Sequence, residues 1–361
     1  MKHASHFRTG SRLAALFVAL WLLWQLPTAV SPTLAQSDPA AALTSAASWL
    51  HTTHQNDDGG FSSFSTGANA APSDPGGTLD ALLALSAAGA DSAAARDYLQ
   101  ANAAALADFA AADGGSGGKT LLALSAAGAD PAAFAGQDFV ALLQGQLADG
   151  SYATANPFAQ SLAILGLRGA GAAIDATAVS YLQSLQAADG SWDDGFGTAA
   201  NVDATAMAVM ALVAAGVPAA DDSLARAGSF LRQARLADGW EYGPGFGANA
   251  NSTALAIQAL AALGDDVTAE LDTLLAWQGA SGAFQADFGD GPFADFFTTV
   301  QAMPALTARP YPLNVEIAAA ASASTAAAPS AAGVVSILAL AAAGAAIVVA
   351  AIWALRRKPA G

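Results

Sequence analysis

Apolar residues recur at helical spacing along most of the chain, and short polar turns interrupt them at regular intervals. In residues 181–186 the apolar side chains fall on one helical face, and Asp189-Gly190-Ser191-Trp192 then ends the pattern. Glycine readily adopts the left-handed conformation that closes a helix, and tryptophan supplies a large apolar anchor beyond it. A second apolar segment follows, with Asn201 as the predicted cap of its first amides and Gly216 at its end. Residues 181–216 are therefore predicted to form a helical hairpin.

The same unit recurs along the chain, which indicates an internal repeat. Residues 83–91 and 122–130 are identical over nine positions and lie 39 positions apart. The turn element occurs six times: Asp58-Gly59-Gly60-Phe61, Asp113-Gly114-Gly115, Asp149-Gly150-Ser151-Tyr152, Asp189-Gly190-Ser191-Trp192, Asp238-Gly239-Trp240 and Ser281-Gly282-Ala283-Phe284. Each turn is followed by an apolar segment with a hydroxyl residue: Thr78, Thr120, Ser161, Thr205, Thr253 and Thr298. Residues 40–310 are therefore predicted to form six hairpins.

Six hairpins can stack as an open array or close into a ring. An open array needs polar capping repeats at its ends. The first and last units of this chain are as apolar and aromatic as the inner ones. We therefore predict an all-α fold, a closed α/α toroid of twelve helices, with an open helical array as the alternative.

The two ends of the chain carry predicted targeting segments. Residues 1–35 combine a basic start, an apolar run and small residues at a cleavage point, which is typical of a secretory signal peptide; an uncleaved anchor is the alternative. Residues 333–355 are uncharged and long enough to cross a bilayer core as a helix, and the basic tail 356–361 is expected in the cytoplasm. The toroid then comprises residues 36–312, and residues 313–332 form an Ala/Ser/Pro-rich linker. We expect a single-pass cell-membrane protein whose N-terminal domain is extracytoplasmic.

Charge and composition exclude several functions. Of the 361 residues 54% are hydrophobic and 12% are charged, enough for a sizeable core. All 29 acidic residues lie between Asp38 and Glu316, together with 7 of the 13 basic ones, which gives this region a net charge of −22. Such a surface repels nucleic acid and anionic lipid headgroups. The absence of cysteine excludes disulfides and thiolate metal ligands.

A helix that ends in glutamine, an Asp-Gly-x-aromatic turn and an apolar threonine-bearing helix together resemble the repeats of the terpenoid cyclase and protein prenyltransferase superfamily. Gln186 with the turn at 189–192 is similar to the Gln-to-Trp repeat of squalene–hopene cyclases, and so is Gln233 with Gly239-Trp240. The resemblance implies a toroid of six outer and six inner helices. It says less about activity, because one fold carries many functions.

The resemblance implies one candidate catalytic acid, Asp203. Class II cyclases protonate an alkene or epoxide from an Asp-x-Asp-Asp-Thr-Ala motif, which resembles Asn201-Val202-Asp203-Ala204-Thr205-Ala206. Only the middle carboxylate remains here, and a general acid needs neighbours that adjust its pKa. The next unit has Asn251 in the place of Asp203. The competing interpretation is therefore a polar helix start that caps the amides or favours the dipole.

No metal site and no cofactor are predicted. The zinc site of protein prenyltransferases and the thioester of related toroids both need cysteine, which this chain lacks. His51 and His54 have a spacing that can share a metal, but no clear third ligand stands beside them. Residues 189–195 resemble the start of an EF-hand loop, but the sixth position is Asp194 rather than glycine. Resemblance to cobalamin carriers implies a corrin ligand, to which no residue here points.

We expect a non-catalytic toroid whose concave end binds a hydrophobic small molecule or a protein. The candidate ligand-binding residues are Asn201, Asp203, Asn249, Asn251, Phe293, Asp295, Phe296 and Phe297. The other aromatic residues that could line the same cavity are Trp192, Trp240, Tyr242, Phe246 and Phe284. Packing between hairpins is the simpler role for Trp192 and Trp240. Two alternatives stay open: a divergent class II terpene cyclase-like enzyme with Asp203 as general acid, and a structural surface protein.

Overall fold

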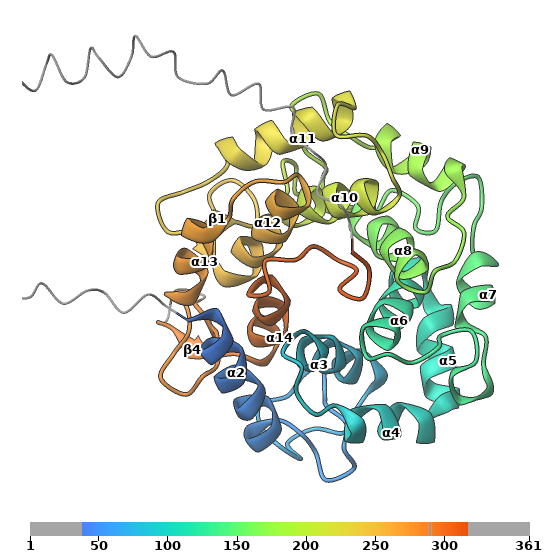
Figure 1. Ribbon diagram of the computed structural model, residues 1–361, viewed down its shortest axis with the longest axis vertical. Coiled ribbons are helices and arrows are strands. Elements are labelled where there is room, and N and C mark those ends of the chain that lie inside the picture. Colours follow the sequence, from blue (N-terminus) through green and yellow to red (C-terminus); the bar gives the residue numbers. More distant parts are fainter. Residues whose placement is uncertain (1–37, 288, 290, 317–361) are drawn as a thin grey trace, which may run out of the picture.

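A computed structural model of the chain describes residues 38–287, 289 and 291–316, and these form a ring of helices in two layers (Figure 1). The outer layer consists of α2 (Pro39–Thr53), α4 (Ala93–Ala101), α5 (Ala103–Ala112), α7 (Phe139–Gln144), α9 (Ala176–Ser184), α11 (Asp222–Gln233) and α13 (Thr268–Leu275). The inner layer consists of α3 (Pro75–Ala87), α6 (Gly114–Ala126), α8 (Pro157–Gly169), α10 (Val202–Ala214), α12 (Ala250–Ala262) and α14 (Phe296–Ala305). A 3-10 turn, Phe134–Gly136, precedes α7.

Two short antiparallel strand pairs lie in the loops that connect the outer layer to the inner layer. The pairs are β1 (Trp240–Glu241) with β2 (Ala248–Asn249), and β3 (Gln285–Ala286) with β4 (Phe293–Ala294). Each pair lies just before an inner helix, α12 or α14. The strands therefore hold the loops that lead into those two helices.

The ring closes, as the sequence predicts. The described residues form thirteen α-helices rather than the predicted twelve, because the pair α4 and α5 takes the place of one outer helix. Each outer helix, or this pair, leads to one inner helix, and α14 packs against α3 (Figure 1). In the outer layer the Gln278 Nε2 group donates a hydrogen bond of 2.9 Å to the carbonyl oxygen of Ala42. These contacts join the last hairpin to the first, so neither unit exposes an apolar end.

Burial distinguishes the two layers. All residues of α10, from Val202 to Ala214, are buried. In the outer helix α13 only Leu274 is buried. The inner helix α10 is therefore apolar on almost all sides because it is covered on all sides.

All six inner helices of the described chain begin at an Asp or Asn side chain that accepts a hydrogen bond from a first-turn amide, as N-caps do. These caps are Asp74, Asp113, Asn156, Asn201, Asn249 and Asp295. The prediction that Asn201 caps its helix is confirmed, since its Oδ1 accepts from the Ala204 amide at 2.7 Å. The cap on α6 corrects one prediction: Asp113-Gly114-Gly115 is a helix start, not a turn.

In four of the six units a threonine ties the turn to its inner helix. The Thr205 hydroxyl accepts a hydrogen bond of 2.9 Å from the Trp192 amide, and the Thr253 hydroxyl accepts one of 3.0 Å from Trp240. In the last unit this acceptor is Thr299, on the Phe284 amide, rather than the predicted Thr298. The turn aromatic is thereby fixed between hairpins.

Two helices of the inner ring approach backbone to backbone. A Cβ atom added at Gly118 of α6 would stand 2.3 Å from the Leu162 carbonyl carbon of α8. One added at Gly166 would stand 2.4 Å from the Gly118 carbonyl oxygen. Glycine is therefore required at both positions for α6 and α8 to pack at this distance.

After α14 the chain crosses the inside of the ring (Figure 1). Tyr311 and Leu313 are buried there, and Asn314 Nδ2 donates a 2.8 Å hydrogen bond to the Gly169 carbonyl oxygen. We call residues 306–316 the strap. The boundary predicted after residue 312 falls inside the strap, because Leu313 and Asn314 still pack against the toroid.

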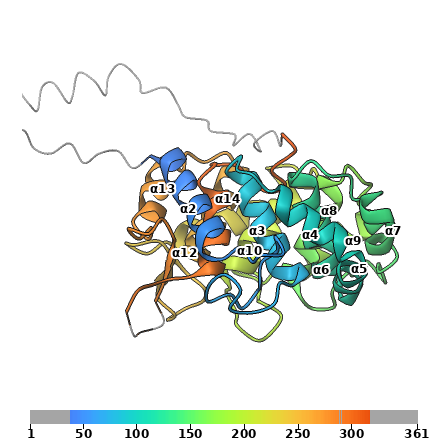
Figure 2. The same ribbon diagram turned by 90° about the horizontal axis from the view of Figure 1, so that it is seen from below.

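Figure 2 shows that residues 38 and 316, the ends of the described chain, lie at one face of the ring, while the long turn loops extend from the other. The predicted signal peptide 1–35, transmembrane helix 333–355 and tail 356–361 lie outside the described residues, as does most of the linker 313–332. Within the described part of the chain, every helix is too short or too polar to span a membrane.

Candidate functional site

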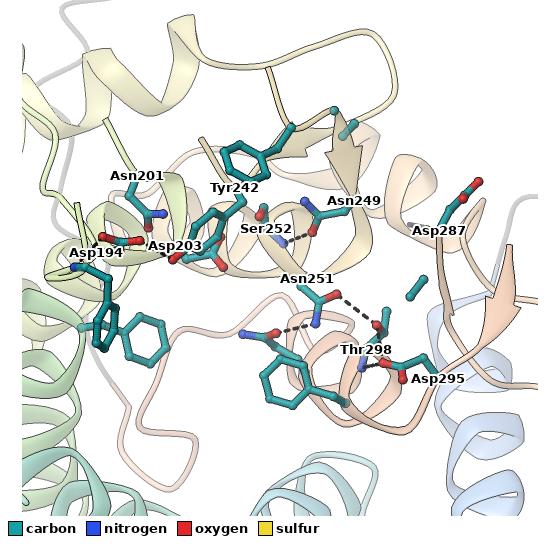
Figure 3. A pocket seen from close by; sticks show the side chains of 18 of the residues that line it. Asp194, Asn201, Asp203, Tyr242, Asn249, Asn251, Ser252, Asp287, Asp295 and Thr298 are labelled. Carbon is teal, nitrogen blue, oxygen red and sulfur yellow. Dashed lines mark hydrogen bonds between the residues drawn. The ribbon is translucent and has the colours of Figure 1, made fainter. Parts of the chain in front are cut away.

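A cavity of about 560 Å³ lies among the N-terminal ends of α8, α10, α12 and α14 and the turn loops before them (Figure 3). It is lined by Asn156, Phe158, Ala159, Asp194, Phe196, Asn201, Asp203, Tyr242, Phe246, Gly247, Ala248, Asn249, Asn251, Ser252, Ala286, Asp287, Asp295, Phe297, Thr298 and Gln301. The long turn loops and the helix caps meet here, so the cavity opens at the face away from the ends of the described chain.

Aromatic side chains surround the mouth of this cavity. Phe196, Phe246 and Phe297 are 86%, 68% and 53% exposed, and the Tyr242 ring meets Phe246 edge-on with centroids 5.7 Å apart. Phe158 adds a fifth ring from α8. Exposed aromatic side chains around a concavity are typical of a ligand site rather than of an ordinary surface.

Asp203, the second residue of α10, forms part of the cavity wall and is only 9% exposed. Burial raises the pKa of its carboxyl group from 3.8 to about 7, although the neighbouring Ser252 hydroxyl offsets part of the rise. A large share of the side chain therefore carries a proton at neutral pH. The Ser252 hydroxyl acts on this carboxyl group as a nearby dipole: by distance and angle, Asp203 Oδ1, Ser252 Oγ and Asn201 Nδ2 are among the buried polar atoms of the described residues that have no hydrogen-bond partner.

A second carboxyl group near the mouth, that of Asp194, is ionised instead of protonated. The Tyr242 hydroxyl donates a 2.8 Å hydrogen bond to Asp194 Oδ2. Burial alone would raise the pKa of Asp194, but hydrogen bonds from the Thr198 amide, the Tyr242 hydroxyl and the Phe196 amide outweigh it and hold the pKa below its ordinary value. Burial, with the hydrogen bond to Asp194, raises the pKa of Tyr242 to about 12. Asp194 is therefore an ionised acceptor and Tyr242 a neutral donor.

A chain of polar side chains forms the opposite wall (Figure 3). Asn251 Nδ2 donates to Gln301 Oε1 at 2.6 Å, and Asn251 Oδ1 accepts from the Thr298 hydroxyl at 3.1 Å. Asp295 accepts from the Thr298 amide at 2.7 Å. These side chains form hydrogen bonds with one another, whereas polar atoms of Asp203, Ser252 and Asn201 on the facing wall have no such partners.

Comparison with known proteins addresses the fold. No protein-family model matches the sequence, and no curated protein matches it either. Among solved structures, it is similar to a protein from Actinoplanes, with 18% identity, a TM-score of 0.55, and 75% of this chain and 99% of that chain covered. It is also similar to a variant of the type II terpene cyclase MstE from Scytonema in complex with its substrate geranylgeranyl dihydroxybenzoate, with 16% identity, a TM-score of 0.53, and 75% and 97% covered.

The chain has the terpenoid cyclase-like α/α toroid fold. It also matches ent-copalyl diphosphate synthase from Streptomyces platensis, with 20% identity, a TM-score of 0.47 and 64% of this chain covered, and there it spans 49% of the length of that enzyme. At these identities the likeness concerns the fold, so the chemistry of this toroid has to be argued from its own side chains.

The toroid brings together six of the eight sequence-predicted candidates. Asn201, Asp203, Asn249, Asn251, Asp295 and Phe297 all line the cavity. Asn201, Asn249 and Asp295 are helix caps, so their side-chain oxygens are engaged by amides. The cap of α10 is Asn201, and Asp203 faces the cavity instead of the helix amides.

Phe293 and Phe296 lie elsewhere, which corrects their predicted place at the cavity. Phe296 is 3% exposed and turns between the hairpins, where its ring stacks on Phe61 at 6.1 Å and lies 5.5 Å from His54. Successive residues of a helix point about 100° apart, so Phe297 faces the cavity while Phe296 faces the core. Phe293, in β4, is 44% exposed and outside the cavity lining.

The other sequence-predicted aromatic residues divide in the same way. Tyr242 and Phe246 line the cavity. Trp192, Trp240 and Phe284 are fully buried, and the two indole Nε1 groups donate to the carbonyl oxygens of Leu182 and Leu231 at 2.8 and 2.7 Å. The packing role predicted for both tryptophans is confirmed.

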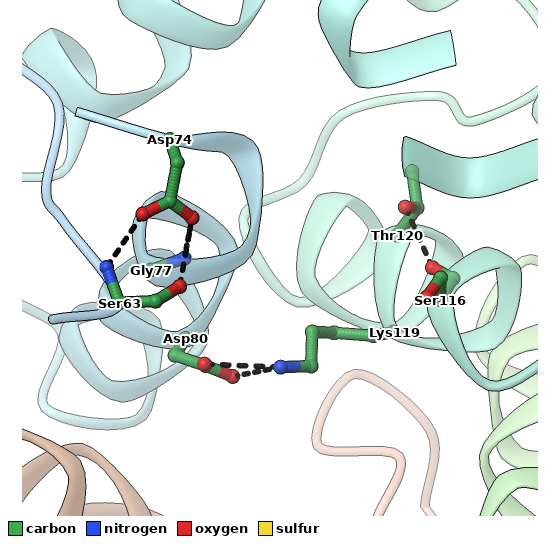
Figure 4. Close-up of polar contacts among 7 residues, drawn as sticks. All are labelled: Ser63, Asp74, Gly77, Asp80, Ser116, Lys119 and Thr120. Atoms are coloured by element: carbon green, nitrogen blue, oxygen red, sulfur yellow. Dashed lines mark hydrogen bonds and ion pairs between the residues drawn. The ribbon is translucent and has the colours of Figure 1, made fainter. Parts of the chain in front are cut away.

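A smaller cavity of about 100 Å³ lies deeper in the ring and shares Phe158, Phe297 and Gln301 with the first. At its wall, Lys119 Nζ pairs with Asp80 Oδ1 at 2.9 Å, across α6 and α3 (Figure 4). Burial raises the pKa of Asp80, and Lys119 opposes the rise. The strap closes this cavity with Tyr311.

The described residues contain no group of three or more Asp, Glu or His side chains placed to hold a metal ion. His51 Nδ1 donates to Gln55 Oε1 at 2.9 Å, while His54 Nδ1 forms a hydrogen bond of 2.6 Å with the Ser65 hydroxyl. The two histidines thus have separate partners.

Sequence reasoning missed Asp194, Phe196, Ser252 and Gln301 as cavity residues. Asp194 and Tyr242 lie 48 positions apart, and only the rotation between adjacent hairpins brings them into contact. The one signal in the sequence is the length of the polar loops before Asn201 and Asn249, because extra loop residues at a helix start add side chains around the mouth.

Proposed function

We propose that this protein is a membrane-anchored, extracytoplasmic toroid that binds an apolar or amphipathic small molecule in the aromatic cavity. One observation supports the proposal most directly: a nine-tenths buried carboxyl group, Asp203, has an unpaired oxygen at the wall of that cavity. An unpaired buried polar group costs about 1–3 kcal/mol of stability. A bound ligand that pairs with Asp203 offsets this cost.

The cavity has the size and lining of a small-molecule site. Its volume of about 560 Å³ falls within the range of roughly 300–1,000 Å³ that is usual for ligand pockets. Aromatic rings form much of the wall, and a few polar groups gather at Asp203 and Asn201. The rings would supply most of the binding free energy through burial of apolar surface, and Asp203 would orient the ligand.

The proposed anchor fits the placement of the cavity. Both ends of the described chain lie at one face of the ring, and residues 333–355 follow the strap in the sequence (Figure 2). The cavity opens among the loops of the other face. A toroid tethered in this way would take its ligand from the aqueous side or from a protein partner, with the C-terminus in the cytoplasm.

The test is ligand-dependent thermal stability of the full-length protein in lipid nanodiscs. Neutral polyprenyl and polycyclic alcohols are expected to raise the melting temperature, because a ligand that binds only the folded state stabilises it. Phe196→Ala should weaken this shift. Phe64→Ala is the matched control, since Phe64 is equally exposed at 86% but lies outside the cavity lining. If no compound stabilises the wild-type protein, the structural surface protein becomes the better description.

A second candidate is a class II cyclase-like reaction, favoured by the protonated share of Asp203 at neutral pH. Asp203 would give its proton to an alkene carbon, the aromatic faces would stabilise the resulting cation, and loss of another proton would complete an isomerisation. Asn201 and Ala204 stand where cyclases have their other two carboxylates. The described residues that line the cavity include no Lys, Arg or His, which argues against a diphosphate substrate.

The enzyme candidate is tested by incubation with squalene or geranylgeraniol and product detection by mass spectrometry. Catalysis requires a cyclised product that Asp203→Asn abolishes and that Asp272→Asn, on the exposed face of α13, leaves unchanged. The absence of product from wild-type protein that demonstrably binds the alcohols would leave binding as the function.

A further inference from the structure

The charges around the large cavity are all of one sign. Its described lining contains four carboxylate residues, Asp194, Asp203, Asp287 and Asp295, and no Lys, Arg or His. Lys119, at the deeper cavity, is paired with Asp80 at 2.9 Å, so it brings no net positive charge. An anionic ligand group would therefore meet repulsion without a partner to compensate for it.

Three of these carboxylates already have partners within the protein. Asp194 accepts from the Phe196 and Thr198 amides and from the Tyr242 hydroxyl. Asp295 caps α14 at Thr298, and Asp287 accepts from the amides of Gly289 and Gly291. They set a negative potential, but they do not by themselves define a ligand position.

Asp203 differs because Oδ1 has no partner among the described residues, although the side chain is 9% exposed. It lines the cavity, and Figure 3 shows its carboxylate beside Tyr242 and Asn201. A buried carboxylate oxygen without a donor is a binding site for a donor. An ammonium group supplies the donor, and its positive charge favours the ionised form of Asp203, which without a ligand is partly protonated at neutral pH.

The aromatic rings complete the same chemistry. The lining contains Phe158, Phe196, Tyr242, Phe246 and Phe297. The faces of such rings attract cations through their quadrupole, and the attraction grows as the cation is desolvated. Rings and carboxylates together therefore select against anions and in favour of cations.

We propose that the ligand is an organic cation: an ammonium group, bound to Asp203 Oδ1, on an apolar body held by the aromatic rings. This inference rests on the proposed binding function. Asn201 Nδ2, which also lacks a partner, is a donor. A ligand that satisfies the whole wall therefore carries an oxygen atom near its ammonium group, as an amino alcohol does.

The test uses three ligands that share one rigid apolar body: 1-adamantylmethylammonium, 1-adamantanemethanol and 1-adamantanecarboxylate. Binding to the full-length protein in nanodiscs is measured by isothermal titration calorimetry, with empty nanodiscs subtracted. We expect the ammonium to bind about tenfold more tightly than the alcohol, and the carboxylate to bind most weakly. Asp203→Asn should bring the ammonium and the alcohol to within about threefold of each other. Asp272→Asn, exposed on α13, should preserve the preference.

The outcomes separate the inference from the function on which it rests. If the alcohol binds as tightly as the ammonium, or if Asp203→Asn keeps the preference, the organic-cation inference is wrong while apolar ligand binding stands. If neither the alcohol nor the ammonium binds, both are wrong. An unchanged melting temperature of Asp203→Asn, or a higher one, shows that a lost preference does not reflect a misfolded variant.

Discussion

Between α6 and α8 the inner helices touch backbone to backbone, whereas α10, α12 and α14 stand around a cavity. Gly118 and Gly166 permit the first arrangement, since neither has a side chain to separate the helices. At the cavity the helix starts carry larger, polar side chains, among them Asp203, Asn251 and Thr298. A ring of similar hairpins thus has a large concave site where polar and aromatic side chains, rather than glycine, lie between the helices. The same repeat therefore forms a close glycine contact on one side of the ring and the wall of a cavity on the other.

The largest effect is expected at the glycine contact. Gly118→Val places a side chain 2.3 Å from the Leu162 carbonyl carbon, so α6 and α8 must separate. We expect a loss of about 3 kcal/mol or more in the free energy of unfolding, or no folded protein. Urea denaturation measures it. Gly145→Ala is the control, because its added Cβ stands 3.3 Å from the nearest atom, and it should change stability by less than about 1 kcal/mol. Wild-type stability of Gly118→Val would show that this contact does not limit the packing.

At the cavity wall, by contrast, the contribution of Asp203 to the free energy of unfolding should depend on pH. The folded-state pKa of Asp203 is raised from 3.8 to about 7, so the folded protein binds this proton more tightly than the unfolded chain does. Wild-type stability should therefore fall as pH rises from about 4 to 7, by up to about 4 kcal/mol from this group. Asp203→Asn should lose that fall and be the more stable protein at pH 8. Urea denaturation at pH 4.5 and 8 tests this, and parallel curves for wild type and variant would contradict it.

The repeated threonine also has different hydrogen-bond roles at the α10 side and at the α6 side of the ring. Thr205 accepts from the buried Trp192 amide, whereas the equally buried Thr120, on α6, donates to the Ser116 carbonyl oxygen. Thr205→Val leaves the amide without its acceptor and should cost about 1–3 kcal/mol. Thr120→Val removes only a donor within one helix and should cost less than about 1 kcal/mol. Equal losses in thermal denaturation would mean that the turn is not fixed by this bond.

The smallest effect is expected at the cavity mouth. Tyr242→Phe removes the hydroxyl that donates to Asp194 Oδ2 and should cost about 0.5–1.5 kcal/mol. The pKa of Asp194 should rise toward its ordinary value, which an NMR titration of its side-chain carbon can follow. Tyr181→Phe removes a hydroxyl that accepts from the Ala155 amide and should leave the titration of Asp194 unchanged. An unaltered Asp194 titration in Tyr242→Phe would show that the amides alone hold this carboxylate ionised.

Much of the scaffold follows from local sequence, because it rests on local physics. The left-handed glycine at Gly190, with φ of 91°, the cap at Asn201 and the buried Trp192 each depend on neighbours a few residues away. Closure of the ring follows from the absence of polar end units. These features repeat, so each unit supports the prediction for the next.

The errors have an equally physical origin. Asp113-Gly114-Gly115 has the composition of a turn, but contact with α8 makes a glycine-rich helix favourable there, which overrides intrinsic propensity. Thr298 and Thr299 are adjacent, and only the helix rotation decides that Thr299 binds the Phe284 amide. The same helical rotation places Phe296 in the core and Phe297 at the cavity. The pairing of Asp194 with Tyr242 depends on how one hairpin turns against the next, which no local pattern records.

The hydrogen bond from Gln278 to Ala42 joins the final hairpin to the first. A linear stack of helices can gain a unit by gene duplication and simply become longer. Here a seventh unit would have to force those two residues apart, and a missing unit would leave them too far away to meet. Circular closure therefore fixes the copy number of the unit, which leaves the loops and side chains within each unit as the places that can vary without opening the ring.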